Sequence, residues 1–240
     1  MKISIVTFTL GSRDHYLNQC IRSILSQEDP PEYEHHIIFQ GAKNSFHYDK
    51  IKLLETYGCI FHEWSENIGI GAGLNKILPE CSGELIFKMD DDCKLISPFL
   101  LSKAYRIYKR FPNSVFSPYP VGLIRNPGGP HGFRYSIWHE KKFDIFYTRR
   151  HVNHVGGFAR FSPASIIKNF KFAADLSAGQ SGTEDGQFSE HCRLNGIDVF
   201  YLENELIVEH NESGLGQIAR YKDYFASRSW ESSVKLDILE

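Results

Sequence analysis

Three consecutive carboxylates, Asp90, Asp91 and Asp92, are the strongest chemical signal in this sequence. They follow Leu85, Ile86 and Phe87, an apolar run that is typical of a buried strand. Their mutual repulsion is costly unless water, a helix terminus or a cation relieves it. Mg²⁺ and Mn²⁺ favour carboxylate oxygens together with substrate phosphates. A solvated acidic loop is the alternative, but a place at the carboxyl end of a parallel strand favours a metal site.

A glycine-rich stretch over residues 66–75 precedes this acidic run and contains Asn67, Gly69 and Asn75. Glycines at the start of a helix let backbone N–H groups approach a phosphate, and the helix terminus favours negative charge. Tight packing of a loop against a helix explains any single glycine equally well. The stretch is therefore a candidate phosphate loop only in combination with other motifs.

Two further motifs carry groups that titrate or bind metals. Glu184 and Asp185 open a predicted helix, where acidic residues are common for electrostatic reasons alone. Their functional interpretation is a general base at the active edge of a sheet. His210 ends a late strand and becomes a candidate cation ligand only if it converges on the three aspartates.

The first half of the chain alternates strand-like and helix-like patterns, which must position these motifs. Strands are predicted over residues 2–9, 36–40, 60–64 and 84–89, and helices over residues 15–27, 50–57, 72–78 and 98–111. Asp14 is expected to cap the first helix, and Pro98 to lie in the first turn of the last one. This order predicts an α/β fold with a mostly parallel central sheet, helices on both faces, and ligands at the carboxyl ends of the strands.

The second half is less regular and predicts a smaller, mixed subregion. Strands or extended segments are expected at 115–119, 156–161, 199–202 and 206–209, helices at 184–194 and 218–230, a loop at 125–132, and a hairpin or mobile flap at 135–152. Nothing marks a domain boundary. We therefore predict one domain over residues 1–240, with a donor half at 1–112 and an acceptor half at 113–240.

Composition narrows the class of protein. Hydrophobic residues make up 42% of the 240 residues and charged residues 23%, a balance that suits a globular core. The net charge of −2 gives no general sign of a nucleic-acid or membrane surface partner. Five scattered cysteines without a C-x-x-C pair favour a reduced, cytoplasmic protein. The sequence shows no signal peptide and no run long enough for a transmembrane anchor.

In this order, the motifs resemble the family 2 inverting glycosyltransferases of the GT-A fold, a Rossmann-like architecture. The resemblance covers residues 2–210. Its segments are Thr7-Phe8-Thr9 with Arg13, Ser23 to Gln27, Asn67-Ile68-Gly69 with Asn75, the aspartates at the D-x-D position, Gly156-Gly157-Phe158, and Glu184-Asp185. The ordered set is more specific than any of its members.

The resemblance implies a role for each motif. It assigns donor binding to Thr7, Thr9, Arg13, Gln40, Asn67, Gly69, Asn75, Asp90 and Asp91. Asp92 would hold Mn²⁺ or Mg²⁺ at the donor diphosphate, with Asp90 and His210 completing the metal site. Asp185, beside Glu184, would deprotonate the acceptor hydroxyl, whose oxygen attacks the anomeric carbon from the opposite face.

The donor is expected to be a nucleoside diphosphate sugar, with uridine favoured, and the group transferred a hexose or pentose. The chain departs from the family at the end of the second strand, where Gln40-Gly41-Ala42 lacks the usual acidic residues. It departs again at Cys93, where the family often has another aspartate. A sugar-nucleotide nucleotidyltransferase and a non-catalytic nucleotide- or sugar-binding module are the alternatives. The first would be expected to open with a glycine-rich basic loop, and the second need not keep Asp185.

A basic, aromatic segment from Arg125 to His154 has no assigned role in this scheme. It contains six arginines and lysines and four histidines, with tyrosine, tryptophan and phenylalanine between them. One hypothesis is a solvated flap that closes over the donor diphosphate. The other is an acceptor-side surface for an anionic acceptor, such as a phosphorylated glycan or nucleic acid, met by cations and stacking rings.

Overall fold

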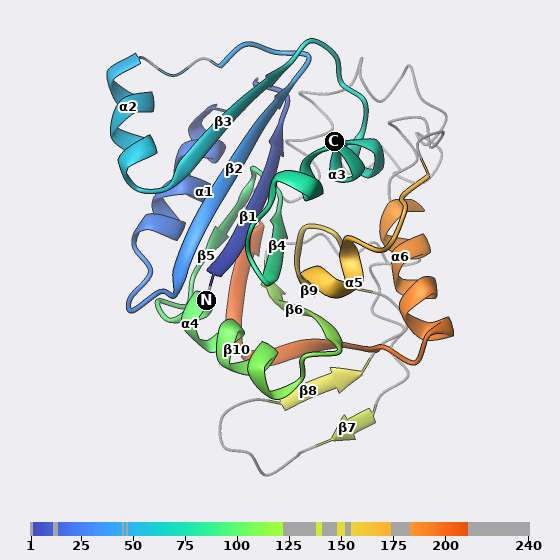
Figure 1. The fold of residues 1–240 in the computed structure, drawn as a ribbon. Helices are drawn as coiled ribbons and strands as arrows, with labels where there is room; N and C mark the ends of the chain where they lie inside the picture. The colour runs from blue at the N-terminus through green and yellow to red at the C-terminus, as the bar shows by residue number, and fades with distance from the viewer. Residues whose placement is uncertain are drawn as a thin grey trace, which may run out of the picture.

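The computed structural model describes residues 2–11, 14–44, 46, 48–121, 138–140, 148–151, 155–173 and 183–210. Within this part of the chain, ten strands form one sheet in the order β3-β2-β1-β4-β9-β6-β10-β8-β7, with β5 paired to β10 (Figure 1). The strands are β1 Lys2–Thr9, β2 Glu32–Gln40, β3 Cys59–Trp64, β4 Leu85–Met89, β5 Cys93–Leu95, β6 Ser114–Val121, β7 Trp138–Glu140, β8 Thr148–His151, β9 Ala159–Pro163 and β10 Asp198–His210.

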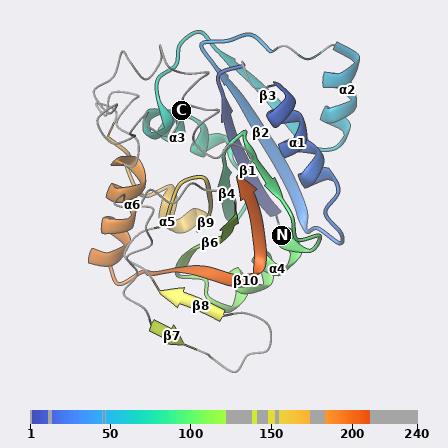
Figure 2. The same ribbon diagram turned by 180° about the vertical axis from the view of Figure 1, so that it is seen from behind.

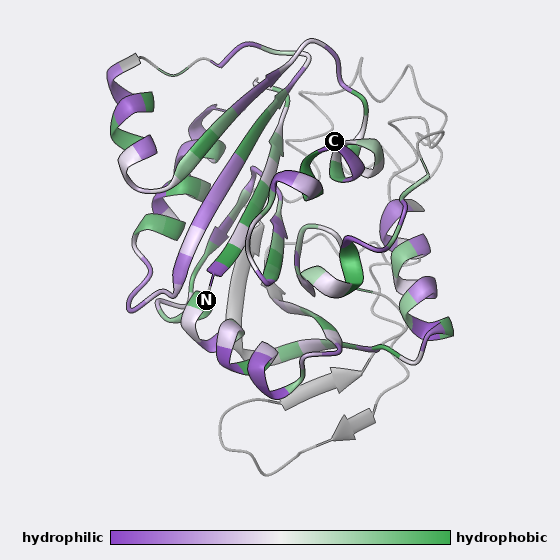
Figure 3. Ribbon diagram, viewed as in Figure 1, coloured by the Kyte–Doolittle hydropathy of each residue, from purple (hydrophilic) through white to green (hydrophobic). Residues whose placement is uncertain are grey.

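Helices cover both faces of this sheet (Figures 1 and 2). They are α1 Asp14–Leu25, α2 Tyr48–Thr56, α3 Ile70–Ile77, the short 3₁₀ helix η1 Leu78–Glu80, α4 Leu100–Arg110, α5 Ala164–Ile167 and α6 Thr183–Leu194. Successive residues of β2 show the division: Ile37 and Phe39 pack in a cluster with α1 and α2, whereas Ile38 packs in the cluster that holds α3. This alternation follows from the two-residue period of a strand. Figure 3 shows the hydrophobic residues concentrated along β1 and β4.

The part of the sheet formed by β3, β2, β1 and β4 is parallel, as predicted. β1 pairs in parallel with both β2 and β4, and β2 pairs in parallel with β3. The carboxyl ends of these strands therefore meet at one edge, where the acidic run follows β4. Beyond β4 the sheet is mixed, because β9 runs antiparallel to both β4 and β6, and β10 runs parallel to β6.

Some predicted boundaries were wrong, for local reasons. Pro98 lies before the first residue of α4 rather than in its first turn, and its carbonyl accepts the backbone N–H of Glu28. The strand predicted at 156–161 is Ala159–Pro163, because the backbone amides of Gly156 and Gly157 bond to side chains instead of to a neighbouring strand. The two segments predicted at 199–202 and 206–209 are one strand, β10, with a register irregularity between Leu202 and Ile207.

Three short elements were not predicted: β5, α5 and the 3₁₀ helix η1. The antiparallel pair of β7 and β8 agrees with a hairpin within 135–152. The loop at 125–132 and the helix at 218–230 lie outside the described residues.

All five cysteines are buried free thiols. No helix in the described part of the chain combines the length and the apolar character that a bilayer crossing requires.

Candidate active site

The three aspartates form a tight turn at the carboxyl end of β4. The backbone N–H of Asp90 donates to the carbonyl of Phe158, at 2.8 Å, and the N–H of Cys93 donates back to the carbonyl of Asp90, at 3.2 Å. The chain then enters β5. The predicted position at the edge of a parallel sheet is therefore confirmed, and the turn is fixed to the segment that leads into β9.

The three carboxylates differ in their surroundings. Asp91 is buried, and its Oδ2 accepts a hydrogen bond of 2.7 Å from the Thr9 hydroxyl at the end of β1. Asp92 is buried as well. The Asp90 side chain is 33% exposed and forms an ion pair with the ammonium group of Lys88. The buried Asp91 thus bonds the turn to the end of β1, whereas the Asp90 side chain is partly exposed at the surface of the site.

The sheet brings His210 to this turn. In the antiparallel pairing of β10 with β5, His210 is the partner of Cys93, the residue that follows Asp92. The backbone register therefore joins two segments that lie over one hundred residues apart, as a shared metal site would require. The side chain of His210 lies outside the described residues.

The chemistry of the turn fits a hard divalent cation. Asp90 and Asp92 supply carboxylate oxygens, and Mg²⁺ or Mn²⁺ typically takes one or two such groups together with substrate phosphates. Among the described side chains, no three His, Cys, Asp or Glu residues converge into a complete metal cage. A site of this kind is suited to a cation that arrives with a diphosphate.

Gln40 and Asn67 shape the loop between β3 and α3. Gln40 is buried, and its Oε1 accepts the backbone N–H of Ile68 at 3.1 Å. Asn67 Oδ1 accepts the N–H of Gly69 at 3.0 Å. Gly69, at the N-terminal cap of α3, has a φ of 80°, a conformation that favours glycine. Gln40 and Asn67, two residues predicted to bind the donor nucleotide sugar, thus fix the conformation of this loop at the edge of the sheet.

The predicted donor residues of β1 lie deeper. Thr7 is buried and its hydroxyl is 2.9 Å from Nε2 of His35, so it belongs to the sheet interior. Thr9, by contrast, contacts the acidic turn, because its hydroxyl donates to Asp91. Arg13 lies outside the described residues.

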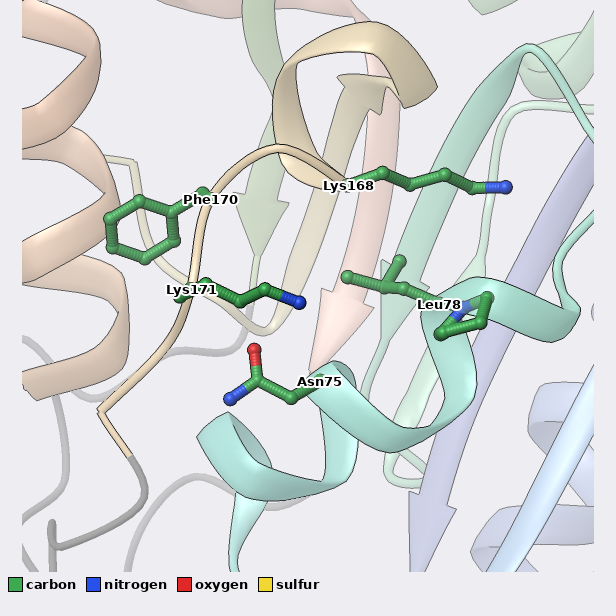
Figure 4. Close-up of a pocket in the computed structure, with 6 residues that line it drawn as sticks. Asn75, Leu78, Lys168, Phe170 and Lys171 are labelled. Carbon is green, nitrogen blue, oxygen red and sulfur yellow. The ribbon is translucent and has the colours of Figure 1, made fainter.

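Asn75 joins α3 to the segment after α5. Its Nδ2 donates to the carbonyl of Phe172 at 2.7 Å, and its Oδ1 accepts the N–H of the same residue at 3.0 Å. Both ends of the amide are therefore engaged with one backbone residue. Beside this clamp lies a small pocket between the two segments, lined by Asn75, Leu78, Pro79, Lys168, Phe170 and Lys171 (Figure 4). None of these lining residues belongs to the acidic turn or to the Glu184–Asp185 pair.

The carboxylate of Asp185 is held from two sides at the start of α6. Its Oδ2 accepts the backbone N–H of Gly157 at 2.6 Å, and its Oδ1 accepts a hydrogen bond of 2.9 Å from the guanidinium of Arg160. Arg160 is fully buried and lies over the ring of Phe188, 4.6 Å from its centroid. Its Nε and second terminal nitrogen have no hydrogen-bond partner among the described residues. Asp185 is therefore the principal counter-charge of a guanidinium in the protein interior.

Glu184 titrates in a range useful for proton transfer. Burial, followed by the charge of Asp185, raises the pKa of Glu184 to about 7, although Lys88 and Arg160 lower it. A group with a pKa near the working pH is suited to general acid–base catalysis.

Sequence reasoning missed Lys88 and Arg160. Each is a charged residue inside an otherwise apolar strand, in Leu-Ile-Phe-Lys-Met and in Ala-Arg-Phe. A charge at a position where the sheet is covered on both faces indicates a buried partner or a site. That signal was present in the sequence. The basic segment from Arg125 to His154 lies outside the described residues except for the backbone of β7 and β8, so its predicted role stays a prediction.

The sequence matches the family model described as glycosyl transferase family 2 over residues 4–166. The match includes the acidic turn and the glycine-rich loop. Comparison with curated protein sequences gives no significant match.

Solved glycosyltransferases share this fold. S. aureus TarS residues 1–349 in complex with UDP has a TM-score of 0.63 at 16% identity, over 87% of this chain and 60% of that one. The mannosyltransferase PcManGT from Pyrobaculum calidifontis with GDP-Man and Mn²⁺ has a TM-score of 0.68 at 13% identity, over 91% and 59%. GalNAc-T7 with UDP, GalNAc and Mn²⁺ also reaches 0.68 at 13% identity, over 94% and 49%. The chain spans less than two thirds of the length of each of these structures.

Proposed function

The chain belongs to glycosyl transferase family 2, and from this premise we propose that it transfers a sugar from a nucleoside diphosphate sugar to an acceptor hydroxyl with inversion. One observation carries the proposal. Adjacent residues bind the two acidic motifs: Gly157 donates its N–H to Asp185, and Phe158 accepts the N–H of Asp90. The backbone of the acidic turn and the carboxylate of Asp185, far apart in sequence, are therefore bonded to one short segment.

In this proposal, the acidic turn receives the donor diphosphate. Asp92 and Asp90 would hold Mn²⁺ or Mg²⁺, with His210 from the paired end of β10 as a further ligand. The cation would neutralise the charge that develops on the departing nucleoside diphosphate. The Mn²⁺ in the PcManGT and GalNAc-T7 structures supports a divalent ion without deciding which one is used here.

The remaining donor residues would act mostly by fixing the loops around the nucleotide. Gln40 and Asn67 hold the loop at Gly69, and Asn75 holds α3 to the segment before α6. Thr7, Thr9 and Asp91 fix the end of β1 and the turn from within. Arg13 is proposed to contact the diphosphate. Uridine is the proposed base, and the TarS and GalNAc-T7 structures with UDP support it, whereas GDP-Man in PcManGT represents the alternative.

Asp185 is proposed as the general base. Its two hydrogen bonds fix its orientation, and each oxygen keeps a second lone pair to accept a proton. As the acceptor oxygen bonds to the anomeric carbon, the bond to the diphosphate breaks and the hydroxyl proton passes to the Glu184–Asp185 pair. The protein contributes mainly alignment and electrostatics. For the acceptor, the segment from Arg125 to His154 is the proposed contact, with an anionic group the class that it suits.

Hydrolysis of a panel of nucleotide sugars tests the proposal. We expect slow diphosphate release from one donor, dependent on Mn²⁺ or Mg²⁺, which falls by at least about 100-fold in Asp92→Ala because the cation loses a ligand. Asp49→Ala, on the exposed side of α2, is the matched control and should keep full activity.

Two other outcomes would contradict the proposal. Release of inorganic pyrophosphate from a nucleoside triphosphate and a sugar phosphate would identify a nucleotidyltransferase. Binding of nucleotides without any turnover, unchanged in Asp92→Ala, would identify a binding module.

A further inference from the structure

Two buried cations face each other across the centre of the sheet. Lys88 of β4 and Arg160 of β9 are register partners in the antiparallel pairing of these strands. Only 4% of Lys88 and 1% of Arg160 is exposed. Directly opposed residues of antiparallel strands lie on the same face, where like charges destabilise the pair. Removal of two charges from water adds a further cost of several kcal/mol for each ion in general.

Each cation has a different acidic motif as its partner. The ammonium of Lys88 pairs with Asp90 of the acidic turn, and the guanidinium of Arg160 pairs with Asp185 of α6. The adjacent register pair on the opposite face is apolar: the rings of Phe87 and Phe161 stack 3.9 Å apart. Since apolar residues fill this sheet well, stability alone does not account for the buried charges.

We propose that Lys88 is a positioning residue of the reaction, whose ammonium group fixes the donor-side carboxylate Asp90 and links it electrostatically to the Glu184–Asp185 pair. The inference rests on the proposed function and adds to it a residue outside both acidic motifs. Arg160 holds the base-side carboxylate, and Lys88, directly opposite, holds the donor-side one. The two strands therefore set the relative position of the two motifs.

The electrostatics of the site agree with this link. The ammonium of Lys88 is bonded to Asp90 inside the sheet, and its register partner Arg160 is bonded to Asp185. In turn, Lys88 lowers the pKa of Glu184 against burial and the charge of Asp185. Asp185, Lys88 and Arg160 are charged groups that act on Glu184. Lys88 is the member of this set that also pairs with the acidic turn.

Lys88→Met tests the link, since it removes the charge and keeps the length of the side chain. Asp90 is partly exposed and can be hydrated, so the variant is expected to fold. The titration of the Glu184 carboxyl carbon, followed by NMR, should move upward from about 7 by about one pH unit. The turnover number for donor hydrolysis should fall by about 100-fold as Asp90 loses its fixed orientation. Lys88→Arg should recover most of both properties.

Lys52→Met on the exposed face of α2 is the matched control and should change neither property. An unchanged Glu184 titration together with turnover within twofold of wild type in Lys88→Met would overturn the proposal. If Lys88→Met does not fold, the double variant Lys88→Met with Asp90→Asn removes both partners, and the same upward movement is expected. A wild-type chain that turns over no donor contradicts the proposed function, whereas the Glu184 titration still decides whether Lys88 links the motifs.

Discussion

At the scale of single residues, the site depends on close contacts that leave no space for a side chain. Gly157 is the clearest case, because a Cβ atom placed there would lie 2.2 Å from Oδ1 of Asp185. The same glycine donates its N–H to the other carboxylate oxygen. Gly186, one residue after Asp185 along α6, has no described atom within 4 Å of the corresponding position. The two glycines therefore form a natural pair for comparison.

Gly157→Ala should displace Asp185 and weaken its bond to Arg160. We expect a loss of about 1–3 kcal/mol of stability, as for other overpacked sites, and a fall of about 100-fold in kcat/KM. Gly186→Ala should instead stabilise the protein by about 0.5–1 kcal/mol, because alanine is the better helix former. Thermal unfolding and donor hydrolysis measure both effects. Full activity in Gly157→Ala would show that the position of Asp185 is not important for the reaction.

The residues that form the site were easier to predict from the sequence than the contacts between them. The sequence marked Asp90 because it follows an apolar run and Asp185 because it opens a predicted helix, whereas Gly157 entered only through the resemblance to the family. It could not show that Asp185 pairs with Arg160, since that contact depends on how β9 packs beside α6. Likewise, Thr7 was expected at the donor but its hydroxyl is bonded to His35 inside the sheet, because Thr7 lies two residues before the end of β1.

At the scale of elements, α3 connects the two halves of the site. Its first turn contacts the segment before α6: a Cβ atom at Gly71 would lie 3.3 Å from the carbonyl of Ala173 and 3.7 Å from the Cβ of Glu184. One helical turn later, Asn75 clamps Phe172 through two hydrogen bonds. Helix α3 thus follows the glycine-rich loop and makes both contacts: its first turn lies against Glu184, and Asn75 holds Phe172.

Asn75→Ala should loosen this connection. Phe172 would lose the partners of both its backbone groups, at a cost of about 1–2 kcal/mol for this partly buried contact. We expect kcat/KM for donor hydrolysis to fall by about tenfold as α6 shifts relative to α3. Asn169→Ala removes an exposed hydrogen bond from the side-chain amide of Asn169 to the carbonyl of Ser165, and it should leave activity unchanged. Equal effects of the two substitutions would argue against a specific role for the clamp.

Elements with a clear local pattern were predicted well, and elements that depend on a distant partner were not. The apolar runs of β1 and β4 and the helical spacing of α1 determine their own structure. β5 has three residues, and its pairing partner is the end of β10, so only the completed sheet makes it a strand. That pairing also brings the backbone of His210 beside the acidic turn. Since the pairing depends on the completed sheet, the sequence alone could not show that the two converge.

At the scale of the whole molecule, the sheet encloses titratable groups that burial holds in their neutral form. His35 in β2 is fully buried against Thr7 of β1. Burial, with a smaller effect from His36, lowers its pKa from 6.5 to about 3. Burial also lowers the pKa of His62 in the neighbouring strand β3. Both residues stay neutral in the folded protein at a pH where the unfolded chain would protonate them.

The sign of the resulting pH dependence follows from linkage. Below pH 6.5 the unfolded state binds a proton at position 35 that the folded state does not, so the free energy of unfolding falls as the pH falls toward 3. For His35 alone, the loss between pH 7 and pH 5 should be about 2 kcal/mol. Urea unfolding at pH 7, 6 and 5 measures it.

His35→Asn should lower the stability at pH 7 but flatten the dependence on pH, with the remaining slope due partly to His62. His15→Gln, on the exposed face of α1, should leave the slope as in wild type. If His35→Asn kept the full slope, the buried imidazole would not be the source of the acid sensitivity.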